Sequence, residues 1–549
     1  MLKGIPGSPG YGSGIVVVKQ ERLIEPEFFK GCDPKKEIDR FRNAQATYSR
    51  QLEALIQNPG EAGEAAVEIF KAYKAILHDE TFFSKAFERV KSDEINMEYA
   101  IRRECDAVVA QFESLDDPYI RERAADIENV CNKIISLMMG VERNVNIPEN
   151  LKDVIIVASD LSPDETIEMD KSVLRGFVTE KGGATSHTVI LAKTLGIPAI
   201  TGVSGLLGSV SDGDHLLADA FLGTVVINPD ARQKTSFEVS SSEFNLRQKK
   251  YAEGISRPAV TLDGYEICVN INTGDKNSID TFSSDMCDGI GLLRTEFLYM
   301  DRSDYPDEET QYEVYSGLAI KAKGKEVIIR TLDIGGDKQV GYMNLPVEEN
   351  PFLGCRAIRL CFSRRDIFHT QLRAILRASN HGMVKIMFPM IVNIEELREA
   401  KACVKKAKES LREEGKGFNE NIPIGIMIET PAAVLISDRL ANESDFLSIG
   451  SNDLIGYLTA TDRMNENVQY LYDSANLAVL NAIKITAKSA EAAGIPWGIC
   501  GEVASEDRMV PLWVALGVSE LSVAPSMVGR IKHLISLNSR NFNPYIRKS

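Results

Sequence analysis

Hydrophobic positions change their spacing along the chain, and each change marks a different kind of structure. Residues 1–20 hold a Gly/Pro-rich turn followed by GIVVVKQ, a run typical of a strand. From 21 to 143 proline is scarce, and charged and apolar residues alternate at helical spacing, as in YIRERAADIENVCNKIISLM. Short β-rich runs separated by turn residues return between 144 and 230. We therefore expect an α/β domain (1–20 and 144–230) with an all-helical domain (21–143) inserted into it.

The rest of the chain shows a regular alternation. The polar stretch 231–255, with SSSEFNLRQKK at its centre, predicts an exposed connecting helix or a hinge. Between 256 and 549 short apolar runs recur with mostly helical segments between them: EICVNIN, GIGLLRT, EVIIRTLD, VKIMFPM, IGIMIET, FLSIGSND, WGICGE and LSVAPS. Strands that alternate with helices in this number predict a (β/α)8 barrel. The predicted fold class is therefore multidomain α/β with a C-terminal (β/α)8 barrel.

Composition and charge narrow the class of protein. The 549 residues are 44% hydrophobic and 26% charged, which is typical of a globular protein with ample core. A net charge of −16 argues against general nucleic-acid binding. The N-terminus does not resemble a signal peptide, and no apolar run is long enough to span a membrane. Nine scattered cysteines without CxxC pairs suit a reducing compartment, so we expect a cytoplasmic protein with no membrane insertion.

Polar or reactive side chains follow several of the predicted barrel strands. The carboxyl ends of such strands form one face, which holds the active site of these barrels, so these side chains should converge. They are Arg294, Arg330, Glu429, Asn452 with Asp453, and Cys500, and the loops add Arg356 and Arg463. Arginines suit phosphate and carboxylate, and paired carboxylates suit Mg²⁺ with a phosphorylated substrate. Taken singly, each arginine has a simpler explanation as a surface ion pair, and Cys500 as a small buried residue.

A second motif, GGATSHTVILAKTLGIPAITG, places His187 at the start of a short apolar helix. Thr185 or Ser186 can cap this helix. The helix N-terminus disfavours a positive imidazolium and favours a phosphate, which suits a nucleophilic ring that becomes phosphorylated. The structural alternative is a capped helix in which the histidine is incidental.

These motifs together resemble enzyme I of the bacterial phosphoenolpyruvate–sugar phosphotransferase system along essentially the full chain. The resemblance rests on the histidine motif and on GIGLLRTEFLYMDR, RTLDIGGDK, NPFLGCRAIRL, GIMIETPAA, GSNDLIGYLTATDR and GICGE. Related phosphoenolpyruvate enzymes share single motifs. The order and total length favour enzyme I, because no room remains for the nucleotide-binding domain of those relatives.

The resemblance implies a reaction and assigns roles to residues. Phosphoenolpyruvate would bind in the barrel with Mg²⁺, and His187 would take its phosphoryl group and pass it to the carrier protein HPr. The helical domain would bind HPr, and the protein would be a homodimer through the barrel. Cys500 would protonate the enolpyruvate carbon, Glu429 and Asp453 would hold Mg²⁺, and the remaining strand-end and loop residues would bind substrate: Arg294, Arg330, Arg356, Asn452 and Arg463. Because one rigid arrangement can hardly bring His187 to both partners, we predict a swivel about 231–255.

Several positions depart from the family pattern. Ala184 stands where arginine is common, and the docking helix reads FKAY, with Lys71 replacing an acid and Tyr73 a histidine. Gly456 and Thr461 replace glutamine and valine. These changes leave the chemistry in place but put carrier choice and rate in question.

Two alternatives stay open at this point. One is the nitrogen-related branch of the family, which phosphorylates a regulatory carrier and usually has an extra N-terminal sensory domain. The other is a signalling or scaffold protein that keeps the fold without turnover, against which the retained reactive residues argue.

Overall fold

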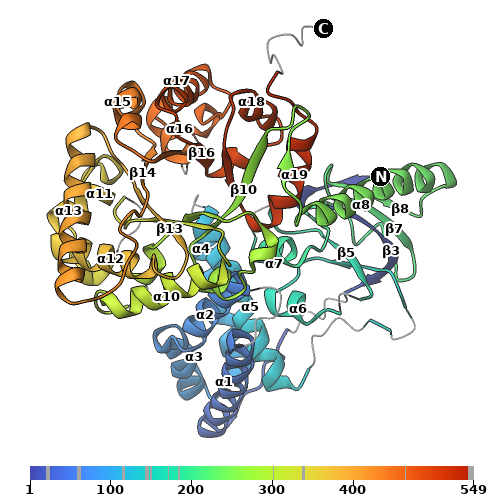
Figure 1. Cartoon of the computed structure of the whole chain (residues 1–549). Coiled ribbons are helices and arrows are strands. Elements are labelled where there is room, and N and C mark those ends of the chain that lie inside the picture. The colour runs from blue at the N-terminus through green and yellow to red at the C-terminus, as the bar shows by residue number, and fades with distance from the viewer. Residues whose placement is uncertain are drawn as a thin grey trace. The chain divides into compact units, whose positions relative to one another are not determined.

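The computed structural model describes residues 1–19, 25–57, 63–113, 118–141, 147–148, 151–170, 172–183, 186–300, 302–336, 340–463, 465 and 467–541. The chain forms two compact units, Met1–Phe244 and Asn245–Ser549 (Figure 1). In these ranges no helix combines the length and apolar character that a membrane span requires.

The first unit contains the predicted helical bundle. Its amphipathic helices turn their apolar faces into one core, in which Phe41, Tyr48 and Phe70 are buried. The helices follow one another between β3 and β4, which confirms an inserted helical part. They are α1 (Pro34–Gln57), α2 (Gly63–Leu77), α3 (Glu80–Asp93), α4 (Met97–Glu113) and α5 (Pro118–Met139).

The α/β part of this unit is built on a mixed sheet with the strand order β1-β8-β7-β3-β4-β5-β6-β2. Strand β4 is buried throughout and pairs in parallel with β3 and β5, as its continuous VIIVA run favours. One face of the sheet packs against α7 through Ala192, whereas Leu191 of α7 joins the core of the helical bundle. The elements are β1 (Leu2–Lys3), β2 (Ile5–Ser8), β3 (Tyr11–Val18), β4 (Val154–Ala158), α6 (Pro163–Glu168), β5 (Leu174–Thr179), α7 (His187–Leu195), β6 (Ala199–Thr201), β7 (His215–Asp219) and β8 (Thr224–Ile227).

The predicted connecting segment is one helix, α8 (Ala231–Gly254), with no buried residue. Its first half is attached to the first unit, because the ring of Tyr11 lies 5.4 Å from that of Phe237 and 5.8 Å from that of Phe244. Its last turn is attached to the second unit, where Tyr251 packs on His533 with ring centroids 5.4 Å apart. Between these two anchors the helix is polar and exposed.

The second unit is the predicted barrel. Strands β10–β17 are parallel, and pairing of β10 with β11 closes the ring. The helices surround the strands (Figure 1), and apolar side chains of both form one core, whereas a separate small core includes Ile328, Met387 and Cys500. The strands are β9 (Ala259–Val260), β10 (Glu266–Thr273), β11 (Ile290–Leu293), β12 (Glu326–Arg330), β13 (Met383–Phe388), β14 (Ile424–Ile428), β15 (Phe446–Gly450), β16 (Trp497–Cys500) and β17 (Glu520–Val523).

The barrel helices fall between these strands, as the sequence predicts. They are α9 (Lys276–Asp280), α10 (Glu308–Lys321), α11 (Ala357–Ser363), α12 (Arg365–Ala378), α13 (Ile394–Glu413), α14 (Pro431–Leu435), α15 (Ser437–Asn442), α16 (Ser451–Thr459), α17 (Leu477–Ala493), α18 (Val510–Ala515) and α19 (Val528–Ser536). The predicted fold class is confirmed.

Candidate functional site

The predicted barrel residues lie at the carboxyl ends of the strands. Arg330 and Cys500 are the last residues of β12 and β16. Arg294 and Glu429 directly follow β11 and β14, and Asp453 lies in the first turn of α16, which begins where β15 ends. Because the strands are parallel, their ends share one face of the barrel.

Buried ion pairs join several of these side chains into a chain of alternating charge. The Arg330 guanidinium donates to Glu296 at 2.5 Å and contacts Asp333 at 2.9 Å. Arg356 also pairs with Asp333, at 2.9 Å, and reaches Asp453 at 3.2 Å. Burial alone would disfavour the two cations, but these carboxylates raise the pKa of both guanidiniums above the ordinary value. The result is two fixed positive charges at one end of the barrel.

Glu429 is the most deeply placed carboxylate of the group. It is 1% exposed, and its Oε1 accepts a hydrogen bond from the backbone N–H of Met390 at 2.6 Å. Gly450 leaves room for it, since a β-carbon there would lie 2.7 Å from Oε2 of Glu429. Burial, followed by the negative charges of Asp453 and Asp333, raises the pKa of Glu429 well above its ordinary value. The opposing effects of Arg330 and Arg356 are smaller than these contributions.

Cys500 faces the barrel interior beside this cluster and is 2% exposed. Its thiol donates to the carbonyl of Ile449 at 3.4 Å, and Ser448 donates to its sulfur at 3.6 Å. Burial raises the pKa of the thiol to about 11, so Cys500 carries its proton at neutral pH.

The remaining predicted residues lie around the rim. Gly274 accommodates Arg294, because a β-carbon there would come within 2.6 Å of the Arg294 Cβ. The side-chain oxygen of Asn452 accepts from the backbone N–H of Glu502 at 3.2 Å. Arg463 is partly exposed and lies 3.9 Å from the Glu502 carboxylate, which is a long ion pair. Arg463 also forms a side-chain hydrogen bond with Tyr472.

Sequence reasoning missed Glu296 and Asp333. Glu296 follows Arg294 by two residues, and Asp333 follows Arg330 by three. This spacing could have identified them, because a carboxylate two or three residues after a strand-end arginine can reach the same end of the barrel. Both side chains are almost fully buried and hold the arginines that the sequence identified.

His187 belongs to the first unit, at the first position of α7. Ser186 is the N-cap and accepts from the backbone N–H of Val189 at 3.4 Å, so the predicted serine cap is present. Thr185 and Ala184 lie outside the described residues. Gly182 has a φ of 95°, a left-handed conformation that favours glycine. The motif therefore places the histidine ring at a helix N-terminus, as expected.

The structure adds a partner for this ring that the sequence did not reveal. Nδ1 of His187 lies 3.0 Å from Oδ1 of Asp126 on α5. An ionised carboxylate only accepts hydrogen bonds, so Nδ1 carries the proton and Nε2 keeps its lone pair. Asp126 is 2% exposed, and its second oxygen faces the guanidinium of Arg123 at 3.8 Å.

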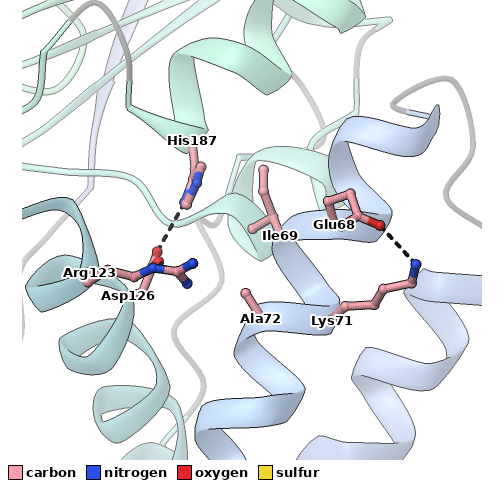
Figure 2. A pocket seen from close by; sticks show the side chains of 7 residues that line it. All are labelled: Glu68, Ile69, Lys71, Ala72, Arg123, Asp126 and His187. Carbon is pink, nitrogen blue, oxygen red and sulfur yellow. Dashed lines mark hydrogen bonds and ion pairs between the residues drawn. The ribbon is translucent and has the colours of Figure 1, made fainter. Parts of the chain in front are cut away.

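A pocket of about 450 Å³ opens beside His187 between α2 and α5 (Figure 2). Its polar lining includes Lys71, which pairs with Glu68 at 2.8 Å on the same helix. Tyr73, the other departure from the family pattern, is buried and accepts from Asn129 at 3.0 Å. Tyr73 is thus a core residue of the bundle, whereas Lys71 faces the pocket.

The chain contains two candidate sites with different chemistry. The barrel face has buried cations, buried carboxylates and a protonated thiol, which suits a small anion that gains a proton. The first unit has an imidazole held through Nδ1 beside an open pocket, which suits a nucleophile that meets a macromolecular partner. Gly456 lies in α16 and its carbonyl accepts from the backbone N–H of Thr461 at 2.9 Å, while the Thr461 hydroxyl donates to the carbonyl of Thr459 at 3.0 Å.

Comparison with known proteins independently indicates the same family. Three family models match parts of the chain. The model "PEP-utilising enzyme, PEP-binding domain" matches residues 248–539. The models "PEP-utilising enzyme, N-terminal" and "PEP-utilising enzyme, mobile domain" match residues 3–123 and 151–223. The phosphoenolpyruvate-protein phosphotransferase of Bacillus subtilis is 38% identical over 96% of this chain and 92% of its own length. That of Listeria monocytogenes is 39% identical over 97% of this chain and 93% of its own. The chain belongs to the phosphoenolpyruvate-protein phosphotransferase family of PEP-utilising enzymes.

Proposed function

We propose that this protein transfers the phosphoryl group of phosphoenolpyruvate to its own His187 and then to a histidine of an HPr-type carrier, releasing pyruvate. The observation that carries the proposal is the convergence of Arg330, Arg356 and Glu429 at one end of the barrel. Phosphoryl transfer needs mainly positioning and neutralisation of charge, which fixed arginines provide. Arg294, Asn452 and Arg463 complete the substrate site in this account.

Mg²⁺ is the proposed cofactor, and the residues fit it. Among the described residues, no cluster of three or more His, Cys, Asp or Glu side chains could enclose a metal ion. Glu429 and Asp453 nevertheless lie close together, since after burial the charge of Asp453 contributes most to the raised pKa of Glu429. Mg²⁺ is commonly held by one or two carboxylates plus water and substrate phosphate, so this pair suffices. When bound, the ion would supply positive charge to the phosphoryl group and to the developing enolate.

Cys500 is the proposed acid for the second half of the reaction. Loss of the phosphoryl group leaves an enolate, and a proton on its methylene carbon gives pyruvate. The thiol is protonated at neutral pH because burial raises its pKa to about 11. A proton donor at the reacting carbon makes the step favourable and hard to reverse.

His187 would act as the nucleophile through Nε2, with Asp126 holding the ring through Nδ1. The pocket between α2 and α5 is the proposed approach for the carrier. Movement between the two partners would take place in α8, between the anchor at Phe244 and the anchor at Tyr251. A homodimer through the barrel and a cytoplasmic location also belong to this proposal.

A transfer assay against a panel of carriers tests the function. The full chain, phosphoenolpyruvate and Mg²⁺ are incubated with HPr-type carriers, including regulatory ones, and pyruvate and phosphocarrier are measured. With a carrier of the sugar phosphotransferase system, we expect pyruvate and phosphocarrier to form in equal amounts. Preference for a regulatory carrier would favour the nitrogen-related branch, and no pyruvate with any carrier would favour a scaffold protein. Sedimentation of the same preparation tests the homodimer.

A further inference from the structure

A second polar cluster lies inside the barrel, toward the amino-terminal ends of the strands, and the proposed reaction does not use it. It contains Glu326 on β12, Lys385 on β13 and Glu520 on β17, with Asn270 of β10 fully buried beside them. Lys385 donates to Oε2 of Glu326 at 2.5 Å, and Asn270 donates to Oε1 of Glu326 at 2.8 Å. Both carboxylate oxygens of Glu326 therefore accept a hydrogen bond.

Glu520 is the carboxyl group of this cluster that favours its protonated form. Among the described residues it forms no salt bridge, and the side-chain oxygen of Asn270 is buried without a donor. Two carboxylates with one lysine leave an excess negative charge, which a proton on Glu520 removes. Burial and the charge of Glu326 raise the pKa of Glu520 to about 8, against the opposing effects of Asn270 and Lys385. Cys268, which also faces this cluster, has a thiol pKa of about 11 and stays neutral.

Gly498 leaves room for the side chain of Glu520, its neighbour in the strand register. A β-carbon on Gly498 would lie 3.4 Å from Oε2 of Glu520, and Gly498 precedes Cys500 by two residues on β16. In the strand register Gly498 lies opposite Ser448 on β15, and the Ser448 hydroxyl already donates to the Cys500 sulfur. The register therefore places Glu520 and Ser448 on either side of Gly498, and the Ser448 hydroxyl contacts the Cys500 thiol.

We propose that Glu520 replaces the proton that Cys500 gives to the substrate, with the Ser448 hydroxyl as the relay. This rests on the proposed function, in which the Cys500 S–H bond breaks as a C–H bond forms on enolpyruvate. The thiolate then takes the proton of Ser448, and Ser448 takes the proton of Glu520. The carboxylate of Glu520 finally regains a proton from solvent, so atoms and charge balance over a turnover.

Two features favour this direction of transfer. A carboxyl group with a pKa of about 8 is a stronger acid than a thiol with a pKa of about 11, so the proton moves downhill to the thiolate. The side chains of Glu326 and Lys385 are each 19% exposed, so solvent reaches the cluster from the amino-terminal end of the barrel. Cys500 can then be reprotonated while the substrate face is occupied.

Exchange of the pyruvate methyl protons with D₂O isolates this step from phosphoryl transfer. The full chain is incubated with Mg²⁺ and pyruvate, and loss of the methyl signal is followed by proton NMR. Glu520→Gln keeps the shape of a neutral acid but cannot pass a proton, so we expect exchange to slow about tenfold or more. Ser448→Ala should slow it similarly. Ser522→Ala, which removes a hydroxyl on a strand next to Cys500 that is bonded to Asn272, is the matched control and should exchange normally.

The outcomes separate the relay from the proposed function. The wild-type rate should rise with pH through about 8, because Cys500 must pass its proton to ionised Glu520 before the thiolate can take a proton from the pyruvate methyl group, and this rise should be absent in Glu520→Gln. If Glu520 had only a structural role, the exchange rate of Glu520→Gln would still change with pH as that of the wild type does. If Cys500→Ala still exchanges normally, the acid assigned in the proposed function is wrong. If Cys500→Ala loses exchange while Glu520→Gln or Ser448→Ala matches the wild type, the relay is overturned and the role of Cys500 stands.

Discussion

Nδ1 of His187 lies 3.0 Å from Oδ1 of Asp126, so the helical bundle fixes the ring of a histidine that the α/β part of the same unit supplies. The contact joins residues 61 positions apart. Because this contact occupies Nδ1, the phosphorylation that we propose for His187 would take place on Nε2.

We predict that Asp126→Asn slows phosphorylation of His187 from phosphoenolpyruvate about tenfold, the equivalent of roughly 1.5 kcal/mol for a charge-assisted hydrogen bond. The amide can present its oxygen or its nitrogen to the ring and no longer selects one tautomer. Rapid-quench labelling gives the rate, and nitrogen-15 NMR of the phosphorylated protein gives the atom. Phosphate on Nδ1 in the wild type would contradict this account of the ring.

Lys71 is predicted to weaken docking of a basic carrier, because it lines the His187 pocket where the family pattern has an acid. Lys71→Glu should tighten binding of such a carrier by about 1 kcal/mol or less, since the side chain is half exposed. The gain should disappear at high salt. Calorimetry measures it, and Lys405→Glu on α13, in the second unit and not part of the lining of this pocket, makes the same charge change. Equal gains in both variants would mean that only net charge matters.

Much of this organisation follows from the sequence because the pattern is local. The VIIVA run is apolar throughout and becomes a central strand, and Arg330 and Cys500 end the strands that their apolar runs predict. The contact of Asp126 with His187 could not be predicted, since it depends on how the bundle packs against α7. The position of Glu520 inside the barrel could not be predicted either. It begins an apolar strand, and only the barrel closure places it near Glu326 and Gly498.

The swivel makes a prediction about α8. A short thiol-reactive staple between Leu246→Cys and Lys250→Cys, in a Cys268→Ser background, stiffens the exposed stretch between the two anchors. Turnover should fall about tenfold or more while phosphoenolpyruvate binding is unchanged. The same staple between Thr235→Cys and Val239→Cys lies in the half attached to Tyr11 and should have little effect. Full turnover with the first staple would refute a hinge at this place.

Glu520 also predicts how stability depends on pH. Its folded pKa of about 8 is above the ordinary value of 4.5, so the fold favours the neutral acid. That stabilisation is complete below pH about 4.5 and is lost as pH rises toward 8. Glu520→Gln cannot titrate, so the melting temperature of the wild type should fall relative to this variant by about 2–4 °C over the same range. Glu502→Gln, at an exposed carboxylate, is the control. Parallel curves for wild type and Glu520→Gln would show that Glu520 is ionised in the folded protein.

The most direct test of the central claim is transfer of label from phosphoenolpyruvate to the full chain in the presence of Mg²⁺. We predict stoichiometric, acid-labile label in the wild type, none in His187→Ala, and greatly slowed labelling in Arg330→Ala, whose guanidinium lies at the centre of the barrel site. Persistent label in His187→Ala, or wild-type labelling in Arg330→Ala, would contradict the account.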